Sequence, residues 1–249
     1  MSRNAREFSE SGIYHIMFRG TNKQPIFLSD WDYMKIIEIL KKLKEDFGFE
    51  LYAYCLMSNH VHLVIKEKEL MDISKIMHGL LTKYSRWFNI KYERTGILME
   101  NRYKSKAVEY DEYLIHLVRY IHQNPQKAGI VEKMGDYRWS SYNRYLKKVE
   151  DELTDVEFFN GILPENRFEA FHEEIEDNSF ELFANSESKD VQLIYELKRA
   201  GVVIPERFAY LSDAEIKAIL EELNSKFSDR QIVRVTGVSD YRLRKIKKG

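Results

Sequence analysis

The apolar residues of this 249-residue chain follow two spacings, and each change of spacing predicts a change of element. Alternating or continuous apolar runs are typical of strands, whereas apolar residues every three or four positions are typical of amphipathic helices. The strands are expected at 13–19, 50–57, 60–66 and 104–110. The helices are expected at 31–46, 72–92 and 111–124.

Their order is strand, helix, strand, strand, helix, strand, helix. We therefore predict an α+β fold: a ferredoxin-like α/β sandwich, in which helices cover an antiparallel sheet, with one extra helix at its C-terminal end. This fold supports many functions, so the function has to be argued from the site.

Two histidines flank a single apolar residue in the strand predicted over 60–66. Because successive side chains on a strand point to opposite faces, His60 and His62 should point the same way. Two adjacent imidazoles can bind a divalent metal ion. A match this short is also typical of two histidines with a purely structural role, and taken alone it favours that interpretation.

The helix predicted over 111–124 carries a second polar group. His116, Tyr120 and Asn124 are spaced by four residues, so they share one face of the helix. Pro125 should end the helix near Asn124. The tyrosine and the amide could complete a site begun by the histidines, although Tyr120 could equally pack in the core with its hydroxyl hydrogen-bonded.

Five blocks of sequence resemble, in this order, the single-tyrosine HUH transposases that act on single-stranded DNA (the transposase IS200-like family). The resemblance is to the REP-associated tyrosine transposase branch in particular. The blocks lie at 14–22, 53–62, 101–105, 119–125 and 139–142, so the resemblance covers roughly residues 10 to 146.

The resemblance implies a role for each matching residue. Tyr120 would be the nucleophile, and His60, His62 and Asn124 would be the metal ligands. The products of attack would be a covalent 5′-phosphotyrosine and a free 3′-OH, and reversal onto a new strand would give strand transfer. The substrate implied is single-stranded DNA in a hairpin with a flanking guide sequence.

The chemistry is consistent with this assignment. A divalent cation withdraws charge from the anionic oxygens of a phosphodiester, and a tyrosine hydroxyl with a pKa of roughly 10 is a weak nucleophile until its surroundings activate it. Two imidazoles and an amide oxygen suit Mg²⁺ or Mn²⁺, and the ligand types are also compatible with zinc. A metal-activated water that hydrolyses the strand is an alternative.

Composition narrows the class of protein. Apolar residues make up 44% of the chain, enough for a packed core, and Cys55 is the one cysteine, which excludes an intrachain disulfide. No apolar run approaches the ~20 residues of a membrane span, and no secretory signal is recognisable. We therefore expect a cytoplasmic protein with no membrane partner.

The formal net charge of −1 hides an uneven distribution. Residues 1–150 hold 25 Lys and Arg against 19 Asp and Glu, residues 151–200 hold 4 against 14, and residues 201–249 hold 10 against 7. We predict an HUH single-strand DNA domain over 1–148, an acidic helical connector over 149–204 and a DNA-binding domain over 205–249. A monomer is favoured over a homodimer.

Several residues near strand ends and turns of the first domain are candidates for DNA binding. Arg19 and Arg102 lie within the family blocks and are the best candidates for phosphate contacts. Tyr103 and Trp139 could stack on unpaired bases. The full set of polar candidates is Arg19, Asn22, Lys23, Arg102, Lys104 and Lys106.

The C-terminal pattern predicts a helix-turn-helix over 229–246. Gly237 would make the turn and Ser239 would cap the second helix. Arg242, Arg244 and Lys245 could then face duplex DNA. A helical bundle with no DNA role is the alternative. A second function therefore remains open: a sequence-specific DNA-binding regulator whose transposase-like domain is inactive.

Overall fold

The computed structural model describes residues 8–69, 72–149, 151–174, 193, 196–197, 200–202, 205–223 and 227–248. Two compact units make up the chain, Met1–Ile175 and Glu176–Gly249, here called the first and the second unit. Each is described by itself. The finer division at residues 148 and 204 stays a prediction.

A four-stranded antiparallel sheet forms the centre of the first unit. Its strands lie in the order β2-β3-β1-β4. Their bounds are β1 Ile13–Arg19, β2 Glu50–Met57, β3 His60–Lys66 and β4 Lys104–Ala107. The predicted α+β class with an antiparallel sheet is confirmed, although β4 is shorter than the predicted 104–110.

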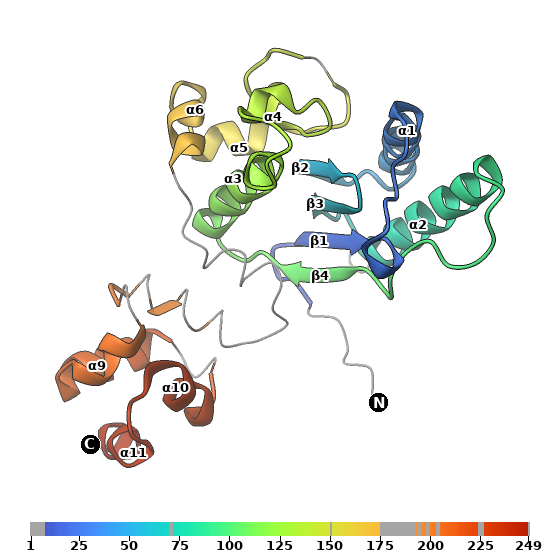
Figure 1. Cartoon of the computed structure of the whole chain (residues 1–249). Coiled ribbons are helices and arrows are strands. Elements are labelled where there is room, and N and C mark those ends of the chain that lie inside the picture. Colours follow the sequence, from blue (N-terminus) through green and yellow to red (C-terminus); the bar gives the residue numbers. More distant parts are fainter. Residues whose placement is uncertain are drawn as a thin grey trace. The chain divides into compact units, whose positions relative to one another are not determined.

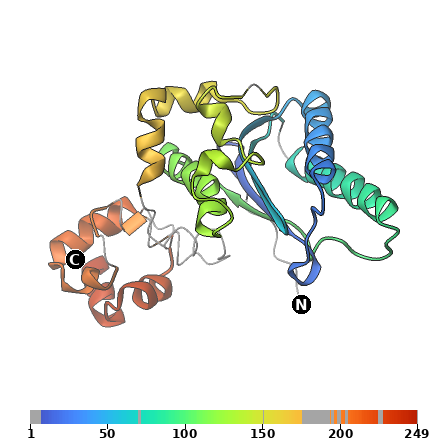
Figure 2. The ribbon, with the colours of Figure 1, turned by 45° about the horizontal axis from the view of Figure 1, so that its top comes forward.

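Helices lie on both faces of this sheet (Figure 1). On one face are α1, Asp30–Phe47, and α2, Asp72–Lys91. On the other is α3, Asp111–Lys127, joined by α4, Tyr142–Tyr145, α5, Glu157–Ile162, and α6, Glu165–Glu173. Turning the molecule shows the sheet between these two helical layers (Figure 2).

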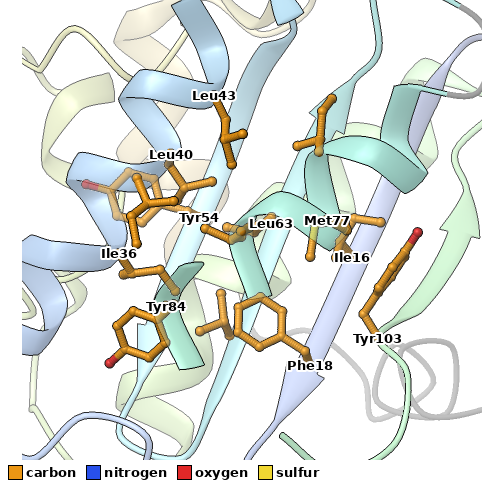
Figure 3. Close-up of a cluster of buried hydrophobic side chains, with 14 of the residues drawn as sticks. Ile16, Phe18, Ile36, Leu40, Leu43, Tyr54, Leu63, Met77, Tyr84 and Tyr103 are labelled. Carbon is orange, nitrogen blue, oxygen red and sulfur yellow. The ribbon is translucent and has the colours of Figure 1, made fainter. Parts of the chain in front are cut away.

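The main core fills the space between the sheet and the pair α1 and α2. Figure 3 shows Leu40 and Met77 from the two helices meeting Ile16 and Leu63 from the sheet. All four side chains are fully buried, at 0% exposed. Alternation along each strand sends the apolar side chains into this core and leaves the intervening ones on the face toward α3.

The predicted end of α3 at Asn124 is wrong, because Pro125 lies inside the helix. Proline cannot donate to the Ile121 carbonyl, the usual cost of this residue in a helix. Here the Asn124 side-chain amide lies 2.7 Å from the Tyr120 carbonyl oxygen and 3.5 Å from that of Ile121. These side-chain contacts offset the missing backbone donor, and the helix continues to Lys127.

Helices make up most of what the structure describes of the second unit. They are η3, Pro205–Tyr210, α9, Asp213–Glu222, α10, Asp229–Thr236, and α11, Asp240–Lys248. Gly237 ends α10 with φ 71°, a left-handed conformation that favours glycine. Val238, Leu243 and Ile246 then join Ile232 in the core of this unit.

No helix in the described part of the chain is both long and apolar enough to cross a membrane.

Candidate active site

The two predicted histidines lie together on the face of the sheet that α3 covers. His62 pairs in register with Cys55 of β2 and Met17 of β1, and His60 pairs with Met57 and Arg19. The two imidazole rings are 5.1 Å apart and nearly perpendicular, at 85°. Strand alternation is the reason that both rings reach the same side.

A third histidine, His15 on β1, extends this pair. Its Nε2 lies 3.0 Å from Nδ1 of His62, and the two rings stack at 5.3 Å with an interplanar angle of 16°. The sequence analysis did not single out His15. The sequence pattern that could have identified it is the alternation along β1. Odd-numbered residues of β1 share one face, so His15 and Arg19 lie on the same face of the sheet as His60 and His62 once β1 is known to pair with β3.

The turn between β2 and β3 holds His60. Asn59 Oδ1 lies 2.7 Å from Nδ1 of His60, and the Asn59 amide donates to the Lys23 carbonyl. Gly20 donates to the Asn59 carbonyl, and a Cβ on Gly20 would lie 2.1 Å from the Gln24 carbonyl oxygen. The loop after β1 can therefore close over this turn only with glycine at position 20.

Burial keeps the three histidines neutral. Desolvation, with a smaller contribution from Lys106, lowers the pKa of His15 to about 3. Desolvation and the Arg19 charge lower the pKa of His60 to about 4. Desolvation and the neighbouring rings of His15 and His60 hold the pKa of His62 well below its usual value. Neutral imidazoles have the lone pair that a metal ion or a proton donor requires.

Tyr120 of α3 meets the histidine pair from the opposite side. Its ring contacts His62 edge to face at 5.9 Å, and the residue is 4% exposed. The Lys127 ammonium lies 5.5 Å from the centre of the same ring. Packing between α3 and the sheet therefore brings a phenol, a lysine and two imidazoles together from segments about 60 residues apart.

Asn124 lies one turn beyond Tyr120 on the same face of α3. Its Nδ2 makes both of its hydrogen bonds, to the carbonyls of Tyr120 and Ile121. Oδ1 accepts none from the residues that the structure describes, so it is available as a ligand oxygen.

A divalent metal fits this donor set chemically. His60 and His62 each have one ring nitrogen bonded to a neighbour, which leaves the other for a metal, and Asn124 contributes an oxygen. Across the described residues, no three His, Cys, Asp or Glu side chains form a group that could hold a metal. A third protein ligand beside His60 and His62 would therefore have to be of another residue type, such as the amide of Asn124.

The predicted DNA-binding residues of the first unit have different surroundings. Arg19 donates from Nε to Glu100 at 2.8 Å and remains 40% exposed. Asn22 and Lys23 are exposed and have left-handed backbone conformations in the loop over the 58–59 turn. Arg102 and Lys104 are exposed where β4 begins. Arg19 lies beside His60 in the sheet, at the same end as this loop.

The two aromatic residues suggested for base stacking do not suit that role. Tyr103 is 8% exposed and belongs to the main core. Trp139 stacks on Tyr33 at 4.4 Å, and the Arg138 guanidinium covers it at 4.2 Å. Both of these predictions are wrong, because packing against neighbours already uses the aromatic surfaces.

The other face of α3 is hydrogen-bonded to α6. Arg119 donates to the Phe171 carbonyl and to the Glu174 carboxylate, and Gln123 donates to the carbonyls of His172 and Glu174. These bonds satisfy carbonyls at the end of α6 that have no partner within the helix. Arg119 and Gln123 therefore have structural roles, although they flank the candidate nucleophile in sequence.

His122 belongs to a buried chain of hydrogen bonds on that same face. His172 Nδ1 donates to the Phe168 carbonyl at 2.9 Å, so its Nε2 accepts from Nδ1 of His122 at 3.0 Å. His122 Nε2 then accepts from the Ser141 hydroxyl at 2.8 Å, and that hydroxyl oxygen accepts from the backbone N–H of Tyr54 in β2. The chain links β2, α3 and α6.

In the second unit, Arg242 points inward. Its guanidinium donates to Asp213 at 2.8 Å and to the carbonyls of Ala209 and Leu211. This placement contradicts its predicted role in DNA binding, because all three of its nitrogens are already bonded within the unit. Arg244 is exposed and pairs with Asp240 one turn earlier, and Lys245 is exposed beside it.

Comparison with known proteins finds a family that resembles part of the first unit. The family model described as "Transposase IS200 like" matches residues 9–124. Over these residues the chain is similar to the transposase IS200-like family. The recognition made from the five sequence blocks is confirmed, and the match contains His60, His62, Tyr120 and Asn124.

Two curated relatives belong to the REP-associated branch of this family, and both have the words REP-associated tyrosine transposase in their names. The Haemophilus influenzae protein is 28% identical over 59% of this chain and 89% of its own length. The Escherichia coli protein is 26% identical over 58% of this chain and 84% of its own length.

A solved structure has the same transposase fold. It is a REP-associated tyrosine transposase bound to a REP hairpin, with a TM-score of 0.51 and 21% identity, and it covers 62% of this chain and 94% of that one. The IS200-like match ends at residue 124, so the second unit lies outside it.

Proposed function

We propose that the first unit is a metal-dependent single-strand DNA endonuclease and strand transferase, in which Tyr120 forms a covalent 5′-phosphotyrosine. The observation that carries this proposal is the contact between the Tyr120 ring and His62 inside a transposase IS200-like domain.

His60, His62 and Asn124 would hold Mg²⁺ or Mn²⁺, ions that accept a mixed set of nitrogen and oxygen ligands, although the ligand types are also compatible with zinc. When bound, the cation withdraws charge from a non-bridging phosphate oxygen. Tyr120 would attack phosphorus and lose its proton, while the bond to the 3′ oxygen breaks and that oxygen leaves as a hydroxyl. Lys127, over the phenol ring, would stabilise the negative charge in this step.

The substrate we propose is a hairpin-forming single strand with a flanking guide sequence. Support comes from the REP hairpin bound to the structural relative and from the basic and polar residues around the His60 end of the sheet. Arg19, Asn22, Lys23, Arg102 and Lys104 would contact its backbone.

The direct test is to incubate the protein with a hairpin-bearing single strand and Mn²⁺ and then run a denaturing gel. We expect a protein–DNA adduct of shifted mobility that Tyr120→Phe abolishes. Tyr210→Phe is the matched control, because Tyr210 is 88% exposed and lies in the second unit. Strand cutting without an adduct would instead support hydrolysis by a metal-activated water.

A second function is proposed for the second unit: binding of duplex DNA by a helix-turn-helix formed by α10 and α11. Support comes from the left-handed Gly237 between the two helices and from Ser239, whose hydroxyl accepts from the Arg242 backbone N–H at the start of α11. Residues near the start of the second helix of such a motif contact base edges.

The exposed face of α11 carries Tyr241, Arg244 and Lys245, and Tyr241 is 80% exposed. These residues would contact the duplex in place of Arg242. Titrating fluorescent duplexes with the whole protein tests this, and Lys245→Ala should weaken binding and lower its salt dependence by about one charge. If the second unit supplied the only DNA activity, His60→Ala would change nothing in either assay, and the regulator alternative would be correct.

A further inference from the structure

His15 is a buried histidine in direct contact with the candidate site, and neither the proposed ligand set nor the proposed reaction uses it. It is 4% exposed, and its neighbour His62 is 2% exposed. Water is therefore unable to compete for the nitrogens that these two rings direct at each other.

A hydrogen bond joins the two rings. His15 Nε2 and His62 Nδ1 are 3.0 Å apart, the length of an N–H to N hydrogen bond. The bond engages Nδ1 of His62 and its proton lies between the two nitrogens, so His62 has only Nε2 left for a metal.

That proton can be on either ring, and the two cases have opposite consequences. If His15 donates, a neutral His62 carries its own proton on Nε2 and has no lone pair there. If His62 donates, its Nε2 has the lone pair and can bind a metal. A second contact that fixes the tautomer of a ligand histidine is the usual arrangement in metal sites.

We propose that His15 is a positioning residue: it accepts the Nδ1 proton of His62 and so fixes the ring and the tautomer in which Nε2 faces the metal. This inference rests on the proposed function. Asn59 does the same for His60 through its side-chain oxygen, 2.7 Å from Nδ1. Each ligand imidazole is then oriented through its Nδ1, that of His60 by an amide and that of His62 by a third imidazole.

The tautomer can be measured on the metal-free, unmodified protein. ¹⁵N correlation spectra of ring-labelled histidine distinguish a nitrogen that carries a proton from one that does not. We expect the His62 signals to report a proton on Nδ1 and none on Nε2, with His62→Gln used to assign them. A proton on Nε2 of His62 would overturn the proposal.

Two substitutions at His15 separate its hydrogen bond from its bulk. His15→Gln can place an amide oxygen close to the position of Nε2, whereas His15→Met fills a similar volume without a comparable acceptor. In a Mn²⁺ titration followed by electron paramagnetic resonance, we expect His15→Met to bind about 10–100-fold more weakly and His15→Gln to recover most of the affinity. Equal affinities in both variants and the unmodified protein would contradict the proposal.

The same titration with His62→Ala separates this inference from the proposed function. If His62→Ala loses Mn²⁺ binding while His15→Met does not, the metal site stands and the role of His15 is wrong. If His62→Ala binds Mn²⁺ as tightly as the unmodified protein, the proposed metal site itself is wrong. Exposed His78→Gln on α2 serves as the control that should change nothing.

Discussion

At the scale of single residues, the candidate site depends on side chains that never touch a substrate. His60 and His62 each direct Nδ1 at a neighbour, which orients both rings and leaves Nε2 of each ring outside these bonds. Tyr120 and Asn124 depend on helical spacing alone, because residues four apart share a face. Losing a support should therefore weaken the site without removing any of its own groups.

Asn59 gives the clearest test of this dependence. We expect Asn59→Ala to weaken Mn²⁺ binding and to slow adduct formation by about tenfold, because His60 loses the acceptor that orients it. Asn59→Asp keeps an oxygen at that position and should recover most of both. Adduct formation at an unchanged rate in Asn59→Ala would show that the His60 ring needs no support from this side chain.

Arg242 and Lys245 are neighbours in sequence with opposite roles. Arg242→Met should lower the free energy of unfolding of the second unit by about 1–3 kcal/mol, because two backbone carbonyls and Asp213 lose their donor. Lys245→Met should change it by less than about 0.5 kcal/mol, as is usual for an exposed site. Urea unfolding followed by circular dichroism measures both. A larger loss in Lys245→Met would contradict the assignment.

At the scale of elements, α3 is central to the first unit because its two faces contact different partners. One face presents Tyr120 to His62 of the sheet, and the other binds the end of α6 through Arg119, His122 and Gln123. The helix is therefore held from both sides, with Tyr120 against His62.

The buried His122–His172 pair predicts acid sensitivity of this arrangement. Burial lowers the pKa of His172 to about 3 and holds that of His122 well below its usual value. In the unfolded chain both would bind protons below about pH 6.5. Their folded pKa values are depressed, so the stability that they give is complete above about pH 6.5 and is lost as the pH falls toward 3.

Each of the two histidines should add about 1.4 kcal/mol per pH unit to this loss. Urea unfolding from about pH 7.5 to about pH 4.5 measures the slope. His172→Gln should reduce it by one proton, whereas exposed His78→Gln should not. The buried histidines of the active site contribute in the same direction, so the difference between the variants is the informative quantity. Equal slopes in all three proteins would contradict the prediction.

Strand alternation and helical spacing, both local rules, were enough to predict the four strands, the helices α1, α2 and α3, and that His60 and His62 share a face. His15 was missed because its partner is set by strand pairing over 47 residues of separation, which no local pattern specifies. The role of Gln123 was missed for the same reason, since the carbonyls that it binds belong to α6. The prediction for Arg242 was wrong because nothing in the sequence of a short basic helix shows that backbone carbonyls lie within reach of one of its charged side chains.

At the scale of the whole molecule, the chain combines two units with separate cores. The first is built around the sheet, and the second has its own apolar cluster that includes Phe208 and Leu243. The family match is confined to the first. Strand cleavage and duplex binding are thus proposed for different units, and each can be disabled by itself.

Two cores predict two unfolding transitions in calorimetry. Gly237→Ala should shift only the transition of the second unit, by the cost of about 1–2 kcal/mol for a side chain at φ 71°. The control is Gly161→Ala in α5, where the structure leaves open space and φ is not positive. Movement of both transitions in Gly237→Ala would mean that the units unfold together.

The hydrogen bonds between α3 and α6 also bear on whether two copies of this protein can share an active site. For one molecule to place its Tyr120 beside the histidines of another, α3 would have to leave its own sheet. It would then either carry α6 with it or break the Arg119, His122 and Gln123 bonds. Catalysis in cis requires neither. A mixture of Tyr120→Phe and His62→Ala proteins should therefore fail to complement, and each molecule should cut with its own tyrosine.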